Sequence, residues 1–244
     1  MSLTKLISIV SEYWPMYLQG AGLTLLISII GTIIGSVIGL LIGTVRTIPM
    51  PEKGIKKGIL KVVNAIITVY VEVFRGTPMI VQAMVIFYGA TSLLHGAAID
   101  RTFAALFIVS INTGAYTSEI TRGGIISVDK GQFEAAHAIG MNHMKTMLNV
   151  VLPQVLRNIL PALGNEFVIN IKDTSVLNVI SVSELFFQTS SVVSNTFDFT
   201  NSFLVASVIY LTMTLTVTRI LRVIERKMEG PDSYKVIPGN QMQV

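Results

Sequence analysis

The sequence predicts an all-α membrane protein with about five transmembrane helices. Of its 244 residues, 51% are hydrophobic and 13% are charged, and this charged share is about half of the roughly 25% that is usual in soluble proteins. The lysines and arginines gather in short segments between long uncharged runs. One longer stretch, from Asp129 to Gln154, has the composition of a water-exposed helical segment. These observations exclude an ordinary soluble domain.

Composition also excludes several kinds of chemistry. The chain has no cysteine, which excludes disulfides, thiolate metal sites and cysteine nucleophiles. The three histidines, His95, His137 and His143, do not have the spacing of metal ligands. The net charge of +4 suits a nucleic-acid partner as well as a membrane, but the basic residues flank apolar runs, which is typical of membrane topology. We therefore expect no metal site, no bound cofactor and no nucleic-acid partner.

The N-terminus does not have the pattern of a cleavable signal, because no small-residue cleavage site follows an apolar core. Tyr13, Trp14 and Tyr17 instead predict an interfacial aromatic belt at the start of the first span. A short amphipathic N-terminal helix whose aromatic residues belong to a core is also compatible with this sequence.

The first span is predicted at 17–45, which carries no charged residue. Four glycines recur in it at every fourth position, so they lie on one face of a helix. Small residues at this spacing allow the backbone of another helix to approach closely, and the sequence does not identify that helix. The four glycines are Gly31, Gly35, Gly39 and Gly43.

The second span, 60–94, is predicted to contain a break. Glu72, Arg75 and Pro78 interrupt its apolar sequence. A single straight helix over this range would be about 50 Å long, which exceeds one crossing, whereas two crossings would leave the first with only about a dozen residues. We therefore predict that 60–74 enters the membrane obliquely and that 77–94 is the crossing proper.

Three more spans complete the predicted domain. They lie at about 102–119, 160–187 and 203–224. A cytoplasmic loop, 122–158, precedes the fourth span, and Pro161 with Gly164 favours an irregular start of that span. A polar segment, 190–202, connects it to the fifth. Residues 1–230 then form one transmembrane domain, and 231–244 form a cytoplasmic tail.

The distribution of basic residues fixes the predicted orientation. With the N-terminus outside, most of the eighteen lysines and arginines fall in three inside segments, at 46–61, 122–158 and 219–235. Only Lys5 and Arg101 fall outside. Two crossings in place of the second span would remove this asymmetry. We therefore predict a multi-pass protein whose N-terminus is outside and whose C-terminus is cytoplasmic.

The loop stretch from Asp129 to Gln154 is predicted to fold as two short helices. Asp129 and Asn142 are good N-cap residues, each placed before a run of helix formers. Gly140 supplies the left-handed turn that ends the first helix. Pro153 is predicted to close the second.

Several sequence motifs of this chain resemble those of a known family, and they occur in the order expected for it. EAAHAIG at 134–140, followed by VVLPQ at 150–154, resembles the cytoplasmic signature of ABC importer permeases. VFRGTPMIVQ at 73–82 and NEFVINIKDTSVLNVI at 165–180 look like the polar-amino-acid branch, the histidine, arginine and glutamine type. The resemblance covers nearly the whole chain, up to about Met228. It departs from the family at Ile139, where a leucine is frequent.

The resemblance implies a type I ABC importer permease fold in a bacterial inner or plasma membrane. It also implies that the loop docks on an ATPase and transmits its closure to the membrane helices. The residues that it assigns to this coupling are Glu134, Ala135, Ala136, Gly140 and Pro153. For Glu134 alone, a purely structural role at its helix N-terminus is equally compatible.

The same resemblance implies partners and an energy source outside this chain. It implies two copies of a cytoplasmic ATP-binding subunit, a second permease, identical or not, and an extracytoplasmic solute-binding protein. The chain contains no GxxxxGK[ST] nucleotide loop. We therefore expect that this chain is not an enzyme and that the partner ATPase uses the ATP and Mg²⁺.

Charged and polar residues at membrane depth are predicted to line a translocation path for a polar amino acid. Ionisable side chains in the bilayer cost ~2.5–3.5 kcal/mol each, so they usually pair or line a wet path. An amino acid carries a carboxylate, which suits an arginine fork, and an ammonium group, which suits acidic side chains. A helix break would let neighbouring charges reach a central cavity. The predicted path residues are Arg75, Thr77, Glu166, Lys172, Asp173 and Thr174.

Other interpretations stay open at this point. The same charges are compatible with an internal salt-bridge network that only joins the spans. A membrane anchor for a cytoplasmic partner would explain the loop but not the charges. An ion-coupled secondary transporter would explain the charges but not the loop, and the sequence has no inverted repeat. The identity of the amino acid is not determined.

Overall fold

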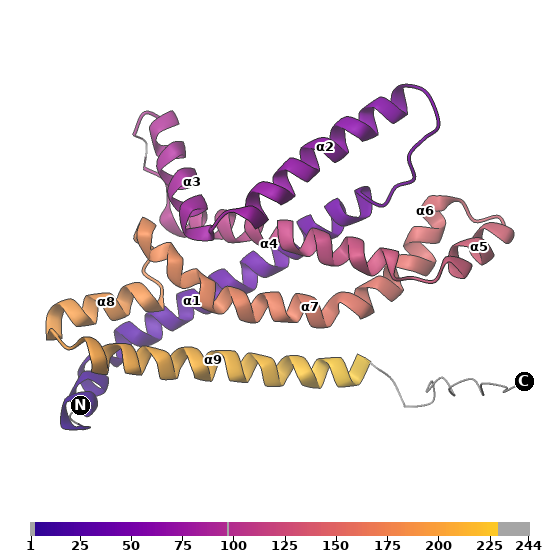
Figure 1. Cartoon of the computed structure of the whole chain (residues 1–244). Helices are drawn as coiled ribbons and strands as arrows, with labels where there is room; N and C mark the ends of the chain where they lie inside the picture. The colour runs from indigo at the N-terminus through magenta and orange to yellow at the C-terminus, as the bar shows by residue number, and fades with distance from the viewer. Residues whose placement is uncertain (1–2, 97, 229–244) are drawn as a thin grey trace, which may run out of the picture.

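The computed structural model describes residues 3–96 and 98–228, and every regular element in this part of the chain is a helix (Figure 1). The α-helical prediction is therefore confirmed. The predicted tail, 231–244, lies outside the described residues. In chain order the elements are α1 (Leu3–Val45), α2 (Ile55–Gly76), α3 (Met79–Leu93), α4 (Arg101–Ile126), α5 (Lys130–Ala138), α6 (His143–Thr146), the π-helical turn η1 (Met147–Val151), α7 (Leu152–Asp173), the 3₁₀ segment η2 (Thr174–Ile180), α8 (Leu185–Thr196) and α9 (Phe199–Met228).

Helix α1 begins well before the predicted first span and continues through Pro15. The aromatic residues near this proline have different environments. Tyr17 is buried, and its hydroxyl donates a hydrogen bond of 3.1 Å to the carbonyl of Ser202 at the start of α9. Trp14 is 55% exposed. Tyr17 is therefore a core residue, and only Trp14 retains the exposure that an interfacial belt requires.

The glycine face of α1 packs against α4. A Cβ atom added at Gly35 would lie 2.6 Å from the Cβ of Thr113, and one added at Gly43 would lie 2.6 Å from the Cβ of Thr121. The Thr117 hydroxyl donates a hydrogen bond of 2.9 Å to the Gly35 carbonyl across this contact. Helix α4 is therefore the helix that approaches the glycine face of α1. Its threonines at every fourth position, Thr113, Thr117 and Thr121, lie against these glycines.

Substituting Gly35 by leucine is expected to destabilise the subunit by ~1–3 kcal/mol or more, because the added side chain has no room against α4. Thermal unfolding of the purified protein in detergent measures this effect. Gly22→Leu is the matched control on the same helix, since no atom lies within 4 Å of a Cβ placed there. Equal transition temperatures for the two variants would contradict the packing argument.

The predicted break in the second span lies between α2 and α3. Helix α2 ends at Gly76, Thr77 is extended with φ −122° and ψ 147°, and Pro78 precedes α3. A proline disfavours helical conformation in the residue before it, which explains the extended Thr77. In Figure 1, α2 projects away from the other helices toward its N-terminal end.

The prediction that Pro153 ends the second loop helix is wrong. The chain stays helical from α6 through η1 into α7, and Pro153 lies in the first turn of α7. The Leu152 N–H donates to the Met147 carbonyl, five residues back, in the π-helical manner. Pro153 lacks the N–H group of a regular helical hydrogen bond, and the hydrogen-bond pattern changes from π-helical to α-helical directly before it. Pro161 also lies within α7, so the predicted irregular start of this span is absent.

Helix α8 occupies part of the stretch that was predicted to be a polar connection. It begins after Glu184, whose carboxylate accepts hydrogen bonds of 2.9 and 2.8 Å from the N–H groups of Phe186 and Phe187. The fourth predicted span is therefore not one helix. Helix α7 ends at Asp173, inside the predicted fourth span, and η2 leads to the turn before α8.

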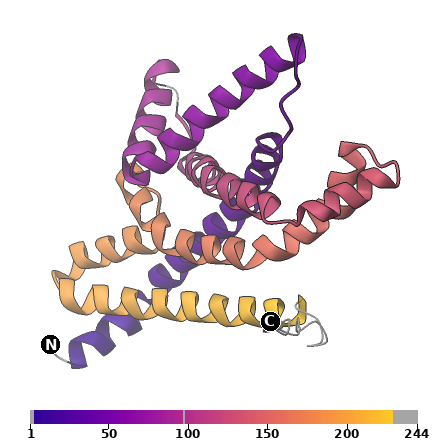
Figure 2. The same ribbon diagram turned by 45° about the vertical axis from the view of Figure 1, so that its right-hand side comes forward.

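The helices place the loop segments at two opposite ends of the molecule (Figure 1, Figure 2). One end holds α5, α6, the connection between α1 and α2, and the C-terminal end of α9. The other end holds α8 and the start of α1. Two described helices, α1 and α9, are by themselves long and apolar enough to cross a membrane, and a bent pair that joins α7 to α8 would add a third. The count of five spans stays a prediction.

Candidate functional site

Four charged side chains, one at the end of α2 and three on α7, lie within electrostatic range of their neighbours. The guanidinium carbon of Arg75 lies 5.6 Å from the ring centre of Tyr116 on α4, within the range of a cation–π contact. Arg75 also interacts electrostatically with Glu166 of α7, and Glu166 does so with Asp173. Lys172 acts on Asp173 in the same way. No direct ion pair joins these four charged residues in the described part of the chain.

The amide of Gln82 fixes the backbone next to Arg75. Its nitrogen lies 2.9 Å from the carbonyl oxygens of Phe74 and Thr77, and 2.9 Å from the Thr77 hydroxyl. Its oxygen accepts a hydrogen bond of 2.8 Å from the side chain of Asn112 on α4. The helix break leaves backbone carbonyls without helical partners, and Gln82 satisfies two of them. The hydrogen bonds of Gln82 therefore stabilise the helix break and connect it to α4, next to which Arg75 lies.

Replacing Gln82 by alanine is expected to destabilise the subunit by ~1–3 kcal/mol, because buried carbonyls and the Asn112 amide lose their partner. Thermal unfolding in detergent is the measurement. The control is Gln154→Ala, since the Gln154 amide bonds only to the Val150 carbonyl within its own helix. If both variants unfold at the wild-type temperature, Gln82 does not hold the break.

The predicted path residues differ in exposure. Arg75, Thr77, Lys172 and Asp173 are exposed, and Glu166 is half-buried. Thr174 is fully buried, and its hydroxyl donates a hydrogen bond of 3.1 Å to the Ile171 carbonyl. Thr174 thus stabilises the start of η2 and does not reach a surface of this chain.

Glu119 is a charged residue whose ion pairs connect two helices. It accepts hydrogen bonds from Arg46, at the end of α1, and from Arg122, which lies one turn further along α4 at 2.9 Å. These three residues join α1 to α4 directly. Within the described ranges, the cluster around Arg75 has no such direct pairs, although its members are close enough to interact.

Glu184 is a buried acid that the sequence reasoning missed. Its side chain is fully buried, caps α8, and accepts a hydrogen bond of 3.0 Å from the Tyr210 hydroxyl of α9. Glutamate is not among the preferred N-cap residues, which are Ser, Thr, Asp and Asn, so the sequence offered no local signal for this cap. The contact with Tyr210 was not predictable either, because that residue is distant in sequence. Both of its carboxylate oxygens accept hydrogen bonds within the chain, so we assign it to the fold.

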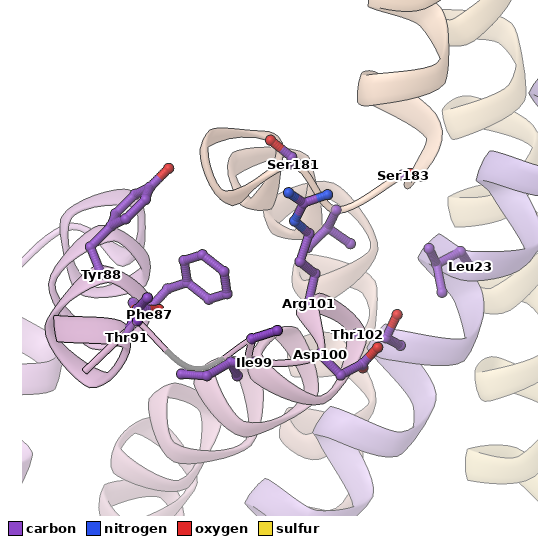
Figure 3. Close-up of a pocket in the computed structure, with 13 residues that line it drawn as sticks. Leu23, Phe87, Tyr88, Thr91, Ile99, Asp100, Arg101, Thr102, Ser181 and Ser183 are labelled. Carbon is purple, nitrogen blue, oxygen red and sulfur yellow. The ribbon is translucent and has the colours of Figure 1, made fainter. Parts of the chain in front are cut away.

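Apart from the charged cluster, a polar pocket lies where the α3–α4 connection meets the turn after η2 (Figure 3). This cavity has a volume of about 550 Å³. Arg101 extends from the start of α4 toward Ser181 in it. The neighbouring Asp100 carboxylate is used as the N-cap of α4, where it accepts a hydrogen bond of 2.7 Å from the Phe103 N–H. The pocket thus offers a cation without a free acid, unlike the cluster around Arg75.

The loop helices α5 and α6 have the predicted caps. The Asp129 carboxylate accepts a hydrogen bond of 2.6 Å from the Gly131 N–H, and the Asn142 side chain accepts one of 2.9 Å from the Lys145 N–H. Gly140 has φ +82° and forms the left-handed turn that was expected. The first helix thus ends at a glycine, as the sequence predicted.

The surface of this loop is partly apolar. Ala136 is 4% exposed and packs inward, so of the two predicted docking alanines only Ala135 faces outward. Glu134 and Pro153 are exposed. Ile139, at the tip, is 79% exposed. A single exposed apolar side chain is common on protein surfaces, so Ile139 alone does not identify a partner.

Comparisons with known proteins place this geometry in context. Residues 54–230 match the family model described as the binding-protein-dependent transport system inner membrane component. The chain is 40% identical over 222 residues to the glutamine transport system permease protein GlnP of Escherichia coli (strain K12), covering 90% of this chain and 97% of GlnP. It is 37% identical over 163 residues to the arginine transport system permease protein ArtQ of Bacillus subtilis (strain 168), covering 67% of this chain and 74% of ArtQ.

A solved structure has the same fold. It is described as the crystal structure of an amino acid ABC transporter with histidines. The match has a TM-score of 0.78 and 36% sequence identity, and it covers 93% of this chain and 100% of that chain. The helical arrangement in Figure 1 is therefore the arrangement of a known transporter subunit.

Proposed function

Because the chain belongs to the family of binding-protein-dependent transport system inner membrane components, we propose that it is the permease subunit of an ATP-driven amino-acid importer. The resemblance to ABC importer permeases and the predicted permease fold are confirmed. The family assignment also makes the chain an inner membrane component. The N-terminus outside and the C-terminus in the cytoplasm belong to the proposal.

The observation that carries the proposal is the cluster of Arg75, Glu166 and Asp173. It offers one cationic and two anionic groups, which match the carboxylate and the ammonium group of an amino acid. Arg75 comes from the end of α2, and Glu166 and Asp173 come from α7; Arg75 is close enough to Glu166 to interact with it electrostatically. GlnP and ArtQ are named for glutamine and arginine, and we propose a polar amino acid as the substrate here.

Coupling to ATP is proposed to occur through α5 and α6. The loop is joined to α7 by the helical turn η1 without a flexible connection. Helix α7 carries Glu166 and Asp173 further along. A displacement of the loop by a partner would therefore be transmitted along one helical segment to the charged cluster. Glu134, Ala135, Gly140 and the exposed Ile139 are the proposed contact and hinge positions.

The proposed partners follow from this assignment. Two copies of a cytoplasmic ATP-binding subunit would hold and hydrolyse ATP with Mg²⁺, so this chain itself is not an enzyme. A second permease, identical or not, would complete the path, and a solute-binding protein would deliver the amino acid from outside.

Reconstitution tests the proposal. The full-length chain is purified from its native membrane with the subunits that accompany it, and uptake of radiolabelled amino acids into liposomes is measured with and without ATP. We expect an ATPase to co-purify and uptake to require both ATP and the solute-binding protein. Glu134→Lys is expected to release the ATPase.

Two results would contradict the proposal. Proton-driven uptake by this chain alone would identify a secondary transporter. Co-purification of a partner without any uptake of glutamine, arginine or related amino acids would favour the membrane anchor.

A further inference from the structure

An apolar groove of about 500 Å³ lies between α1, α7 and α9. Its walls are formed by residues between Ile29 and Leu40 of α1, between Leu156 and Phe167 of α7, and by Leu221 of α9. Thr32, the most buried polar residue of its lining, already accepts a hydrogen bond of 2.8 Å from the Asn170 amide. The groove therefore has little to offer a polar ligand.

The groove has the length of one leaflet. The stretches 29–40 and 156–167 each extend about 16 Å along their helices at ~1.5 Å per residue, which is half of the hydrocarbon core of ~30 Å. Ile33 and Val37 of the groove are 59% and 55% exposed. Apolar side chains with this exposure mark a surface that suits contact with lipid chains or with another protein.

A polar, basic mouth lies at one end of the groove. A second cavity, of about 420 Å³, is lined by Arg157, Glu225 and Met228 among others, and it shares Leu160 with the groove. Arg157 forms no ion pair in the described part of the chain. The lining itself carries one cation and one acid, Arg157 and Glu225. The last described turns of α9 carry three more exposed cations outside this lining, Arg222, Arg226 and Lys227, so the end of the groove lies in a basic region of the described chain.

We propose that this groove binds one anionic phospholipid of the inner leaflet, with an acyl chain between α1, α7 and α9 and the phosphate at Arg157. Basic pockets between transmembrane helices on the cytoplasmic side suit anionic head groups. The mouth is at the same end of the molecule as α5 and α6 (Figure 1, Figure 2). The proposal rests on the membrane location of the chain and on the proposed orientation, and it is independent of the transported solute.

Native mass spectrometry of the full-length chain, purified with its accompanying subunits, tests the site. Phosphatidylglycerol and phosphatidylcholine with the same acyl chains are titrated separately. We expect phosphatidylglycerol to bind at least about fivefold more tightly, and Arg157→Gln to remove this difference. A basic residue near a phosphate contributes ~1 kcal/mol, which is about fivefold in affinity. Ile33→Trp, which fills the groove, is expected to weaken both lipids.

Lys53→Gln is the charge-matched control, because Lys53 is exposed in the α1–α2 connection, away from the groove. Equal effects of Arg157→Gln and Lys53→Gln would overturn the proposal, as would equal affinities for the two lipids in the wild type. A second protein chain is the competing occupant. The chain has no cysteine, so Ile33→Cys introduces a single thiol. Efficient cross-linking of this thiol to another subunit would show that protein covers the groove, and would also overturn the proposal.

Discussion

Replacing both Glu166 and Asp173 by their amides is expected to lower amino-acid uptake about hundredfold while the subunit still folds and assembles. The amides keep the shape of the side chains and remove their charge. The bound amino acid shields these acids from water. An ammonium group that loses such shielded anionic partners loses ~2–5 kcal/mol of binding free energy, and each 1.4 kcal/mol is about tenfold in affinity. ATP-dependent uptake into liposomes, at several substrate concentrations, measures the loss.

Glu52→Gln is the matched control, because Glu52 is an exposed acid in the α1–α2 connection, far from the cluster. Thermal unfolding of each variant separates a transport defect from a folding defect. Wild-type uptake by the double variant would remove these acids from the path. A large loss of stability would instead support a network that joins the spans.

The geometry favours a path over such a network. Where this chain uses charges to join helices, at Glu119, both arginines bond directly to the carboxylate. Among the residues that the structure describes, the cluster of Arg75, Glu166 and Asp173 has no direct ion pair, and two of its members are exposed. Charges held near one another without pairing leave their hydrogen-bonding capacity for a ligand.

Features that depend on local sequence were predicted well. Asp129 and Asn142 cap their helices because an N-cap requires only a side-chain acceptor and the next few N–H groups. Gly140 ends its helix because glycine adopts the positive φ angle that the turn after a helix requires, and this preference belongs to the single residue. The break before Pro78 is local in the same sense. In each case the interacting groups lie within a few residues.

Features that depend on distant contacts or on a subtle helix register were not predictable. Pro153 can end one helix or lie within a longer one. Which of these occurs depends on whether the preceding helix stops or continues through a π-helical turn, and the same residues are compatible with both. The bond between Gln82 and Asn112 and the burial of Glu184 against Tyr210 require the packing of helices that are far apart in sequence. Composition placed these residues in spans but could not pair them.

Replacing Gly140 by proline is expected to reduce ATP-driven uptake to background and to release the ATPase. Gly140 has φ +82°, whereas proline fixes φ near −65°. Its N–H also donates a hydrogen bond of 2.9 Å to the His137 carbonyl, which proline cannot form. The turn between α5 and α6 would have to open, so Glu134 and Ile139 would no longer be presented together. ATPase co-purification and liposome uptake measure the result.

Gly140→Asn distinguishes backbone conformation from loss of a contact. No atom lies within 4 Å of a Cβ at position 140, so side-chain volume alone should be harmless. Asparagine adopts left-handed conformations more readily than other non-glycine residues, and this variant is expected to retain most of the uptake. Gly140 lies in the turn between α5 and α6, outside the helical segment that carries Glu166 and Asp173, so a strained turn alters the docking surface while the path residues stay in place. Full uptake by Gly140→Pro would therefore show that the loop does not transmit force through this turn.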